Sequence, residues 1–230
     1  MLILFDIDGT LVRGAAVAHA EALRAAIRKV HHVDAGSSRL IDVAGRTDGE
    51  IARILLLDAG VSAERIDERA DEVREQCCRA YCTLCPRDLS HTVVPGIPAL
   101  LASLADEPDI TLGLLTGNYE GVARMKLARA GIGSAFASSP GAFGSDSEDR
   151  TALPHIARRR AGASGTPYPR SRTVVIGDTP RDIACARADE VRCVAVTTGP
   201  HGADELAGAD AVATDTQDLR RVLGSMLRTT

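Results

Sequence analysis

Acidic side chains follow two short apolar runs of the chain. Asp6 and Asp8 come directly after the run at residues 2–5, and Asp178 follows the run at 173–176. Apolar runs of this length, rich in β-branched residues, are typical of buried parallel strands. Parallel strands end at a common edge of the sheet, where ligands bind in open α/β folds. The sequence therefore predicts a polar, acidic pocket at this edge.

The chemistry expected of such a pocket follows from the crowding of its carboxylates. Neighbouring negative charges are costly unless a cation or a shared proton relieves them. Asp6, Asp8 and Asp178 together offer hard oxygen ligands suited to Mg²⁺, which usually handles phosphate when few carboxylates hold it. A carboxylate can also be a covalent nucleophile, and a neighbouring carboxylic acid can protonate the leaving oxygen. The alternative is a turn with solvated acids, in which Gly9 supplies a positive φ.

A third apolar run, at residues 111–115, is followed by Thr116, Gly117 and Asn118. Their hydroxyl and backbone N–H groups, next to an expected helix start, would form an anion cradle. The alternative is that Asn118 simply caps the following helix.

The residues after Asp178 also fit the start of a helix. Thr179 is a natural N-cap, Pro180 suits the first helical position, and Asp182 suits the positive end of the helix. Asp178 precedes the cap, so helix chemistry does not explain it. This leaves Asp178 as the stronger candidate for a functional role.

A phosphate site with several carboxylates also needs a fixed cation. Lys126 is excluded as this cation by its position in the middle of the helix expected at 122–130. Arg150 is favoured because it follows a loop rich in Gly, Ser and Asp and precedes the helix expected at 153–161. A guanidinium also binds phosphate or carboxylate through two parallel hydrogen bonds. The arginines at 158–160 are expected on a solvated helix face.

Strand and helix patterns alternate from residue 94 onward, which predicts a Rossmann-like, doubly wound parallel α/β sheet. Residues 14–88 show only helical patterns, so an inserted all-helical cap domain is expected after the first strand. The expected division is an α/β core of residues 1–13 and 89–230 and a cap of residues 14–88. The other expected elements are strands at 111–115, 173–176 and 193–196, candidate strands at 211–213 and near Phe136, and helices at 15–30, 48–58, 63–81, 122–130, 153–161 and 219–227.

Three of these motifs carry a family resemblance. The segments FDIDGTLV, LLTGN and VVIGDTPRDI resemble, in order, motifs one, two and four of the haloacid dehalogenase (HAD) superfamily. The helical insert, GRTD at 45–48 and VPGIPALLASL at 94–104 resemble the C1 cap and post-cap signatures of its phosphoglycolate-phosphatase-like branch. The resemblance covers nearly the whole chain. It implies a Mg²⁺-dependent hydrolase, a phosphatase that acts on a small phosphomonoester through an aspartyl-phosphate intermediate.

The resemblance also implies a role for each acid. Asp6 would be the nucleophile, and Asp8 the general acid and base. Asp6, the backbone carbonyl of Asp8 and Asp178 would hold Mg²⁺, and Asp182 would support the water shell of the metal. The metal set is thus Asp6, Asp8, Asp178 and Asp182.

The remaining roles fall on polar and basic residues. Thr116 would bind the transferring phosphoryl group, helped by Gly117 and the backbone of Asn118. The third motif of the family normally supplies a Lys, and Arg150 is its best match here. Arg46 of GRTD would contact the substrate from the cap, or it merely flanks a helix start.

The composition of the chain indicates which classes of binding partner are expected. The net charge is −4, only 3% of residues are aromatic and Trp is absent, which argues against nucleic acid as a partner. No apolar run approaches the roughly 20 residues that span a membrane. The N-terminal segment does not resemble a signal peptide, so a cytoplasmic location is expected. The expected partner is a small phosphorylated metabolite, and both a monomer and a homodimer remain open.

Four cysteines cluster at Cys77, Cys78, Cys82 and Cys85, and the last two form a CxxC pair. Such a pair can hold zinc or perform redox chemistry. No second pair or matching histidines accompany it, so we interpret the cysteines as small hydrophobic residues of a helix.

Three other functions are compatible with parts of this pattern. An intramolecular sugar phosphomutase of the same superfamily would share every core motif. A haloacid dehalogenase would need neither the second acid nor the metal, so Asp8 and Asp178 argue against it. A non-catalytic phosphate-binding protein is disfavoured by the intact set of Asp6, Asp8, Thr116 and Asp178.

Overall fold

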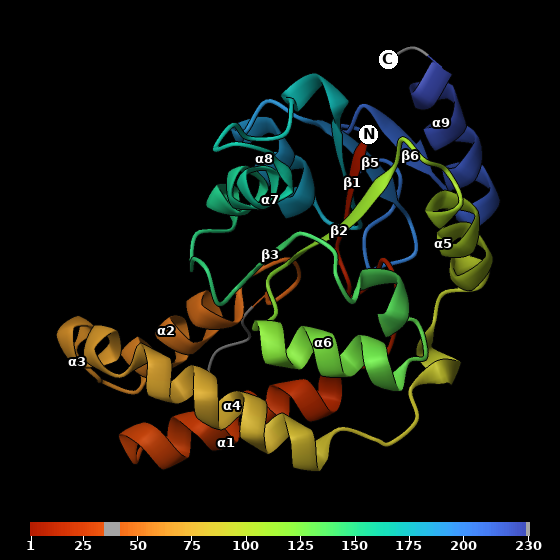
Figure 1. The fold of residues 1–230 in the computed structure, drawn as a ribbon. Helices are drawn as coiled ribbons and strands as arrows, with labels where there is room; N and C mark the ends of the chain where they lie inside the picture. Colours follow the sequence, from red (N-terminus) through yellow and green to blue (C-terminus); the bar gives the residue numbers. More distant parts are fainter. Residues whose placement is uncertain (35–41, 229–230) are drawn as a thin grey trace.

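A six-stranded parallel sheet forms the centre of the computed structural model, which describes residues 1–34 and 42–228 (Figure 1). The strand order is β3-β2-β1-β4-β5-β6, so β1 lies inside the sheet and pairs with β2 and β4. This confirms the predicted doubly wound α/β class. The strands are β1 (Leu2–Phe5), β2 (Thr111–Thr116), β3 (Gly141–Phe143), β4 (Thr173–Gly177), β5 (Arg192–Val196) and β6 (Ala211–Ala213).

Helices cover both faces of the sheet, which explains why its strands are apolar on both sides. Every residue of β1 is buried, and side chains alternate between two hydrophobic clusters. Ile3 and Phe5 belong to the cluster that also holds Leu100 and Leu219, whereas Leu2 and Leu4 belong to the other. The first cluster is covered by α5 (Ile97–Ala105), α6 (Glu120–Arg129) and α9 (Thr216–Arg228), and the second by α7 (Leu153–Ala161) and α8 (Pro180–Ala188).

The segment between β1 and α5 contains helices and short turns in its described part. Its elements are α1 (Ala16–His31), α2 (Asp48–Asp58), α3 (Ala63–Glu68), α4 (Ala70–Leu84) and the 3₁₀ turn η1 (Ser90–Thr92). Figure 1 shows α1 and α4 side by side below the sheet. The ends of the segment meet, because Val12 bridges to Val93 and Leu11 accepts a hydrogen bond from the backbone of Val94.

The prediction of one helix over residues 63–81 is wrong. The chain bends at Arg69, between α3 and α4, where the backbone N–H of Arg69 bonds to Ile66. The guanidinium of Arg69 also donates to the carbonyl of Val30 and so fixes the bend against α1. The contact that breaks the helix is therefore remote in sequence.

The candidate strand near Phe136 is also misplaced. Phe136 lies in the 3₁₀ turn η2 (Gly133–Phe136), and the strand follows at β3. The ring of Phe136 packs edge-on against Phe5, with 6.2 Å between ring centroids. The apolar signal thus reports a core contact. Two further 3₁₀ turns are η3 (Arg150–Ala152) and η4 (Arg170–Arg172).

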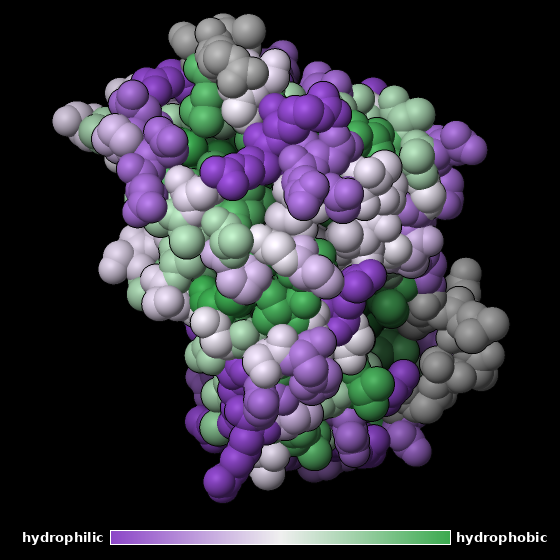
Figure 2. Space-filling model, turned by 90° about the vertical axis from the view of Figure 1, so that its right-hand side faces the viewer, coloured by the Kyte–Doolittle hydropathy of each residue, from purple (hydrophilic) through white to green (hydrophobic). Residues whose placement is uncertain are grey.

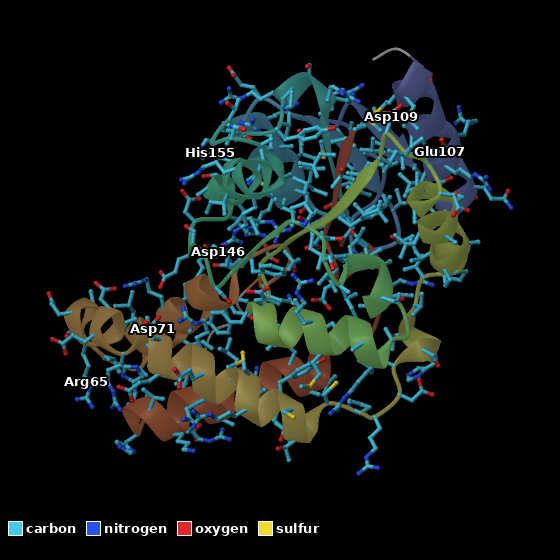
Figure 3. All side chains as sticks on the ribbon, viewed as in Figure 1. Arg65, Asp71, Glu107, Asp109, Asp146 and His155 are labelled. Carbon is cyan, nitrogen blue, oxygen red and sulfur yellow. The ribbon has the colours of Figure 1, made fainter. Side chains whose placement is uncertain are left out.

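The arginine run at the end of α7 does not form a purely solvated face. Arg158 is buried, and its guanidinium forms two hydrogen bonds to Asp189, at 2.6 and 2.9 Å. Arg160 pairs with Asp146, which Figure 3 labels below α7. The interpretation of this run as solvent-facing is therefore wrong for Arg158, because Asp189 provides a buried partner.

None of the helices in the described ranges is long and apolar enough to cross a membrane.

Candidate functional site

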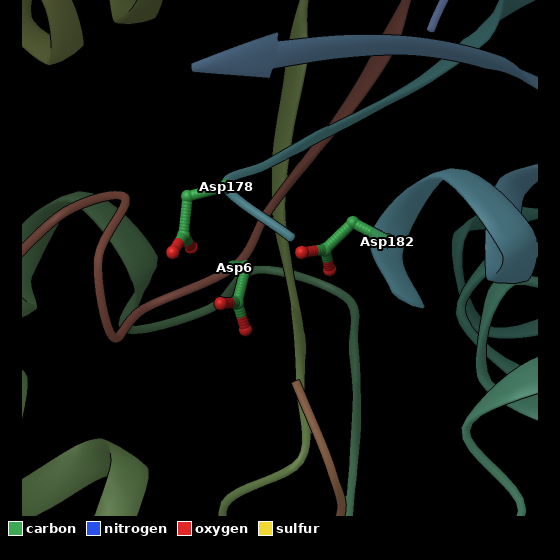
Figure 4. Close-up of side chains that lie close together, drawn as sticks. All are labelled: Asp6, Asp178 and Asp182. Atoms are coloured by element: carbon green, nitrogen blue, oxygen red, sulfur yellow. The ribbon is translucent and has the colours of Figure 1, made fainter. Parts of the chain in front are cut away.

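Three buried carboxylates meet at the carboxyl edge of the sheet (Figure 4). Asp6 follows β1, Asp178 follows β4, and Asp182 lies in the first turn of α8. One oxygen of each lies within 4.8 Å of the others, and all three residues are at most 4% exposed. Within the described ranges, no other group of three His, Cys, Asp or Glu residues is arranged to hold a metal. The structure thus brings together three of the predicted metal residues.

Two glycines make room for Asp178. A Cβ on Gly9 would lie 2.1 Å from Oδ2 of Asp178, and one on Gly199 would lie 1.8 Å from the same atom. Gly9 also has a positive φ of 86°, as the sequence motif suggested. The hydroxyl of Thr10 donates to Oδ1 of Asp178 at 3.0 Å. Side chains larger than glycine would displace this carboxylate.

Asp182 serves the helix and the site together. Its Oδ2 accepts hydrogen bonds from the backbone and the hydroxyl of Thr179, which forms the expected capping box of α8. Its Oδ1 accepts a hydrogen bond from Arg150 at 2.5 Å. Both oxygens are therefore engaged, which fixes the carboxylate beside Asp6.

Arg150 lies where the sequence placed it, beside the candidate nucleophile. It begins η3, whose start is capped by the side chain of Asp149. Its Nη2 lies 3.0 Å from Oδ1 of Asp6, and the guanidinium is buried. The distance supports a role in balancing Asp6, and that role stays a prediction.

The exclusion of Lys126 is wrong, since its ammonium group lies in the site. The side chain is 0% exposed, and Nζ lies 2.6 and 2.8 Å from the two oxygens of Asp8. The same Nζ donates to Oδ1 of Asn118 at 2.8 Å. Side chains on a helix lean toward its N-terminus, and α6 begins at the strand ends. A lysine in mid-helix therefore reaches back to the site.

Asn118 contributes its side chain rather than capping α6. Its Nδ2 donates to Asp8 at 3.0 Å, and its backbone N–H bonds to the hydroxyl of Thr116 at 3.3 Å. The N–H at the start of α6, from Tyr119, donates instead to Oδ2 of Asp48 at 2.7 Å. The capping alternative for Asn118 is not what the structure shows.

The structure adds two residues that the sequence did not predict, Asp48 and His19. They join the helical segment to the loop between β2 and α6. Oδ2 of Asp48 also lies 2.9 Å from Nε2 of His19, and the backbone N–H of Asp48 donates to the carbonyl of Gly117 at 2.8 Å. A Cβ on Gly117 would lie 2.1 Å from the carbonyl oxygen of Arg46, so the close approach needs glycine. The acid in GRTD was the available signal, and it was interpreted only as a helix start.

Arg46 flanks the start of α2 and lines the pocket, and its contact with substrate stays a prediction. It precedes Thr47, which caps α2 by accepting from the backbone of Glu50, and it also lines the pocket above Asp6. Its guanidinium pairs with Glu50 and donates to the carbonyl of Asp42 at 2.8 Å. The pocket has a volume of about 610 Å³ and includes Asp6, Thr116 and Arg150.

The electrostatics of the acids differ sharply. Burial, reinforced by Asp182 and Asp8 and opposed by Arg150, raises the pKa of Asp6 to about 7. Burial and the charges of Asp6 and Asp182 raise the pKa of Asp178 to about 8. For Asp8, burial also disfavours the charged form, but Lys126 and other partners outweigh it and lower the pKa.

These shifts test whether the residues fit a divalent cation. Among the described residues, Arg150 is the one buried cation that contacts this group, through Asp6 and Asp182, and the pKa values of Asp6 and Asp178 are raised toward protonation. A hard divalent cation would supply the missing positive charge to an all-oxygen donor set. The residues therefore fit Mg²⁺.

The four clustered cysteines lie on α4 and directly after it. Cys77 and Cys85 are buried, Cys78 is half-buried and Cys82 is exposed, and all are free thiols. Burial raises the pKa of Cys77, so its thiol is unreactive at neutral pH. Cys77 fits the interpretation as a hydrophobic helix residue, whereas Cys82 is exposed and Cys85 follows the end of α4.

Comparisons with known proteins place this geometry in context. The family model described as haloacid dehalogenase-like hydrolase matches residues 3–187. A search of curated proteins gives no significant match. Among solved structures, the chain is similar to a hydrolase from Pseudomonas syringae, with 23% identity, 98% of this chain and 99% of that chain covered, and a TM-score of 0.65. It is also similar to β-phosphoglucomutase from Clostridium difficile, with 20% identity, 99% of this chain and 97% of that chain covered, and a TM-score of 0.67. A third similar structure is CbbY from Rhodobacter sphaeroides in complex with phosphate, with 22% identity, 93% of each chain covered, and a TM-score of 0.64. At these identities, the likeness to solved structures establishes the fold.

Proposed function

Because the chain belongs to the haloacid dehalogenase-like hydrolases, we propose that it is a Mg²⁺-dependent phosphatase of small phosphomonoesters. The observation that carries the proposal is the setting of Asp6. This carboxylate ends β1, contacts the guanidinium of Arg150 at 3.0 Å, and adjoins Asp178 and Asp182. A nucleophile flanked by a fixed cation and by cation-binding acids suits attack on an anionic phosphate.

The proposed reaction has two steps. An oxygen of Asp6 bonds to phosphorus as the bond to the leaving alcohol breaks, and Asp8 donates a proton to the departing oxygen. Asp8 then takes a proton from water, whose oxygen attacks phosphorus and releases phosphate from Asp6. Lys126 and Asn118 favour the ionised form of Asp8, which suits the second step. Before the first step, Asp8 must bind a proton, and the neighbouring positive charge of Lys126 opposes this protonation.

The metal would be held by Asp6, the backbone carbonyl of Asp8 and Asp178, with Asp182 supporting its water shell. When bound, Mg²⁺ would supply positive charge to the phosphate and the carboxylates. Thr116 and the N–H groups of Gly117 and Asn118 would cradle the phosphoryl oxygens.

The helical segment at residues 14–88 is the proposed cap. Its two ends lie together at the bridge between Val12 and Val93. An attachment at one place would let the whole segment move as one unit relative to the sheet. Its helix α2 lies against the β2–α6 loop through Asp48, and Arg46 lines the pocket. Closure of such a cap would exclude water from the first step.

The proposal is tested by hydrolysis of p-nitrophenyl phosphate with Mg²⁺ and with EDTA. Turnover with Mg²⁺ and its loss in EDTA are expected. Asp6→Asn should abolish turnover and the trapped phosphoenzyme. Asp109→Asn is a matched control, because this exposed acid lies at the opposite edge of the sheet (Figure 3). Turnover that persists in Asp6→Asn would contradict the assignment of the nucleophile, and turnover indifferent to EDTA would contradict the metal.

An intramolecular sugar phosphomutase is the second candidate, because the fold is shared with proteins described as β-phosphoglucomutase. It would use the same core residues and differ in its cap contacts. Interconversion of glucose 1-phosphate and glucose 6-phosphate, followed by ³¹P NMR, would identify it.

A further inference from the structure

The pocket continues beyond Asp6 into the gap between α1 and α2. Helix α1 lines it with residues 16, 19, 20, 23 and 24, and α2 with residues 48, 51 and 55. These spacings place each set on one face of its helix. A volume of about 610 Å³ is far more than a phosphoryl group fills, so the remainder must receive the leaving alcohol.

The polar groups on this side of the pocket are mostly bonded to one another. The Asp48 carboxylate holds both His19 and the backbone of Tyr119, and Arg46 is paired with Glu50. These contacts already occupy Oδ2 of Asp48, Nε2 of His19 and Nη1 of Arg46, which reduces the hydrogen bonding that this side offers to a substrate hydroxyl.

Two arginines complete the polar lining. Arg13 and Arg24 are exposed, and their side chains have no ion pair in the described part of the chain. Because they remain in contact with water, they need no partner from the ligand.

The other side chains on the cap side are apolar. Leu23 and Leu55 are buried, Ile51 is half-buried, and Val43 is 52% exposed beside them. On the face shown in Figure 2, hydrophobic side chains lie recessed between hydrophilic ones. Apolar contact is thus what this half of the pocket offers to a leaving group.

From this lining we infer that the substrate is a phosphomonoester of an apolar alcohol, and that polyhydroxylated sugar phosphates are poor substrates. The inference rests on the proposed phosphatase function. A sugar would exchange hydration of its hydroxyl groups for contact with Leu23, Ile51 and Leu55, and buried polar groups without partners are costly. An alkyl or aryl group would instead gain from leaving water.

Matched pairs of esters test this directly. Hexyl phosphate and glucose 6-phosphate each carry six carbons and a primary phosphate, and propyl phosphate and glycerol 3-phosphate each carry three. The polyols are the better leaving groups, so a preference for alkyl esters must come from binding. We expect kcat/KM for hexyl phosphate to exceed that for glucose 6-phosphate at least about tenfold. It should also rise about tenfold or more from propyl to hexyl phosphate, since each buried methylene is worth about fourfold.

Two variants locate the effect. Ile51→Asn should reduce the preference for hexyl over propyl phosphate about tenfold. Leu57→Asn is the matched control, since Leu57 is on the same helix, is 48% exposed and lies outside the pocket. Ile51→Val covers the case in which Ile51→Asn does not fold, and should reduce the preference by about fourfold.

The outcomes separate the two proposals. If none of the esters, including p-nitrophenyl phosphate, is hydrolysed with Mg²⁺, the proposed function fails. If they are hydrolysed but glucose 6-phosphate equals or exceeds hexyl phosphate, the inference about the leaving group is overturned while the phosphatase stands. An equal loss of preference in Ile51→Asn and Leu57→Asn would also overturn it.

Discussion

Replacing Arg150 by methionine removes the only positive charge in contact with Asp6 within the described residues, while keeping a long side chain. Nη2 of Arg150 lies 3.0 Å from Asp6 and 2.5 Å from Asp182. At 3.0 Å and an effective dielectric constant of about 20, one such contact contributes up to about 5 kcal/mol. Relaxation reduces this figure, and a charge at this distance typically moves a carboxyl pKa by about 1 to 3 units.

The loss should act on the nucleophile itself. With Arg150 present, the pKa of Asp6 is about 7. Without it, the pKa of Asp6 rises above neutrality in the metal-free protein, and each unit leaves about a tenth as much ionised carboxylate at pH 7. A lost cationic contact to the transferring phosphoryl group costs a further factor of about 10² to 10³ in kcat.

Steady-state kinetics of p-nitrophenyl phosphate at saturating Mg²⁺ measure the loss of the cationic contact, because the bound metal also favours the ionised form of Asp6. Arg150→Met should lower kcat/KM at least about 100-fold, and Arg150→Lys should recover part of this because charge survives without the bidentate geometry. Arg159→Met is the control, since this exposed arginine lies on α7 away from the acids. If Arg150→Met keeps near wild-type activity while folded, Lys126 or the metal alone balances the site and the reasoning about Arg150 is refuted.

Lys126→Met should raise the pKa of Asp8, because burial remains while the opposing charge is gone, and shift the acid limb of kcat/KM to higher pH; an unshifted limb in a folded variant would contradict this. The metal-free protein should be less stable at pH 8 than at pH 5, because the raised pKa values of Asp6 and Asp178 make the folded state bind more protons than the unfolded state between about 3.9 and 8. Urea unfolding in EDTA checks the slope, Mg²⁺ should remove it, and a flat profile in EDTA would argue against the shifts. Asp48→Ala should lower the free energy of unfolding by about 1 to 3 kcal/mol, since the buried N–H of Tyr119 loses its acceptor; an unchanged urea midpoint would contradict the contact.

The sheet and the positions of the acids follow from the sequence because their signals are local. Burial on both faces makes the strands apolar throughout, and the acids follow at their ends. The bend at Arg69 and the site of β3 depend instead on tertiary contacts, with Val30 in one case and with β2 in the other. Nothing in a window of neighbouring residues encodes those contacts.

The site itself was only partly predictable for the same reason. Arg150 could be located because it follows a loop and precedes a helix. The position of Lys126 in mid-helix suggests a place on a helix face, whereas the lean of helical side chains toward the helix start carries its ammonium group to Asp8. His19 of α1 and Asp48 of α2 contact each other, and Asp48 also binds the backbone of Tyr119 in the loop before α6. Pairings of that kind emerge only from the fold.

The place of β1 inside the sheet has a consequence for the order in which the chain folds. Helices α1 to α4 all lie within residues 16–84 and pack on one another, whereas the acid cluster needs β4 to join β1, as the bond between Thr10 and Asp178 shows across 168 residues. Long-range pairing is slower than local helix formation. During refolding from urea, the helical circular dichroism should therefore recover before metal-dependent activity does. During synthesis, the nucleophile and the helical segment emerge long before the residues that complete the site.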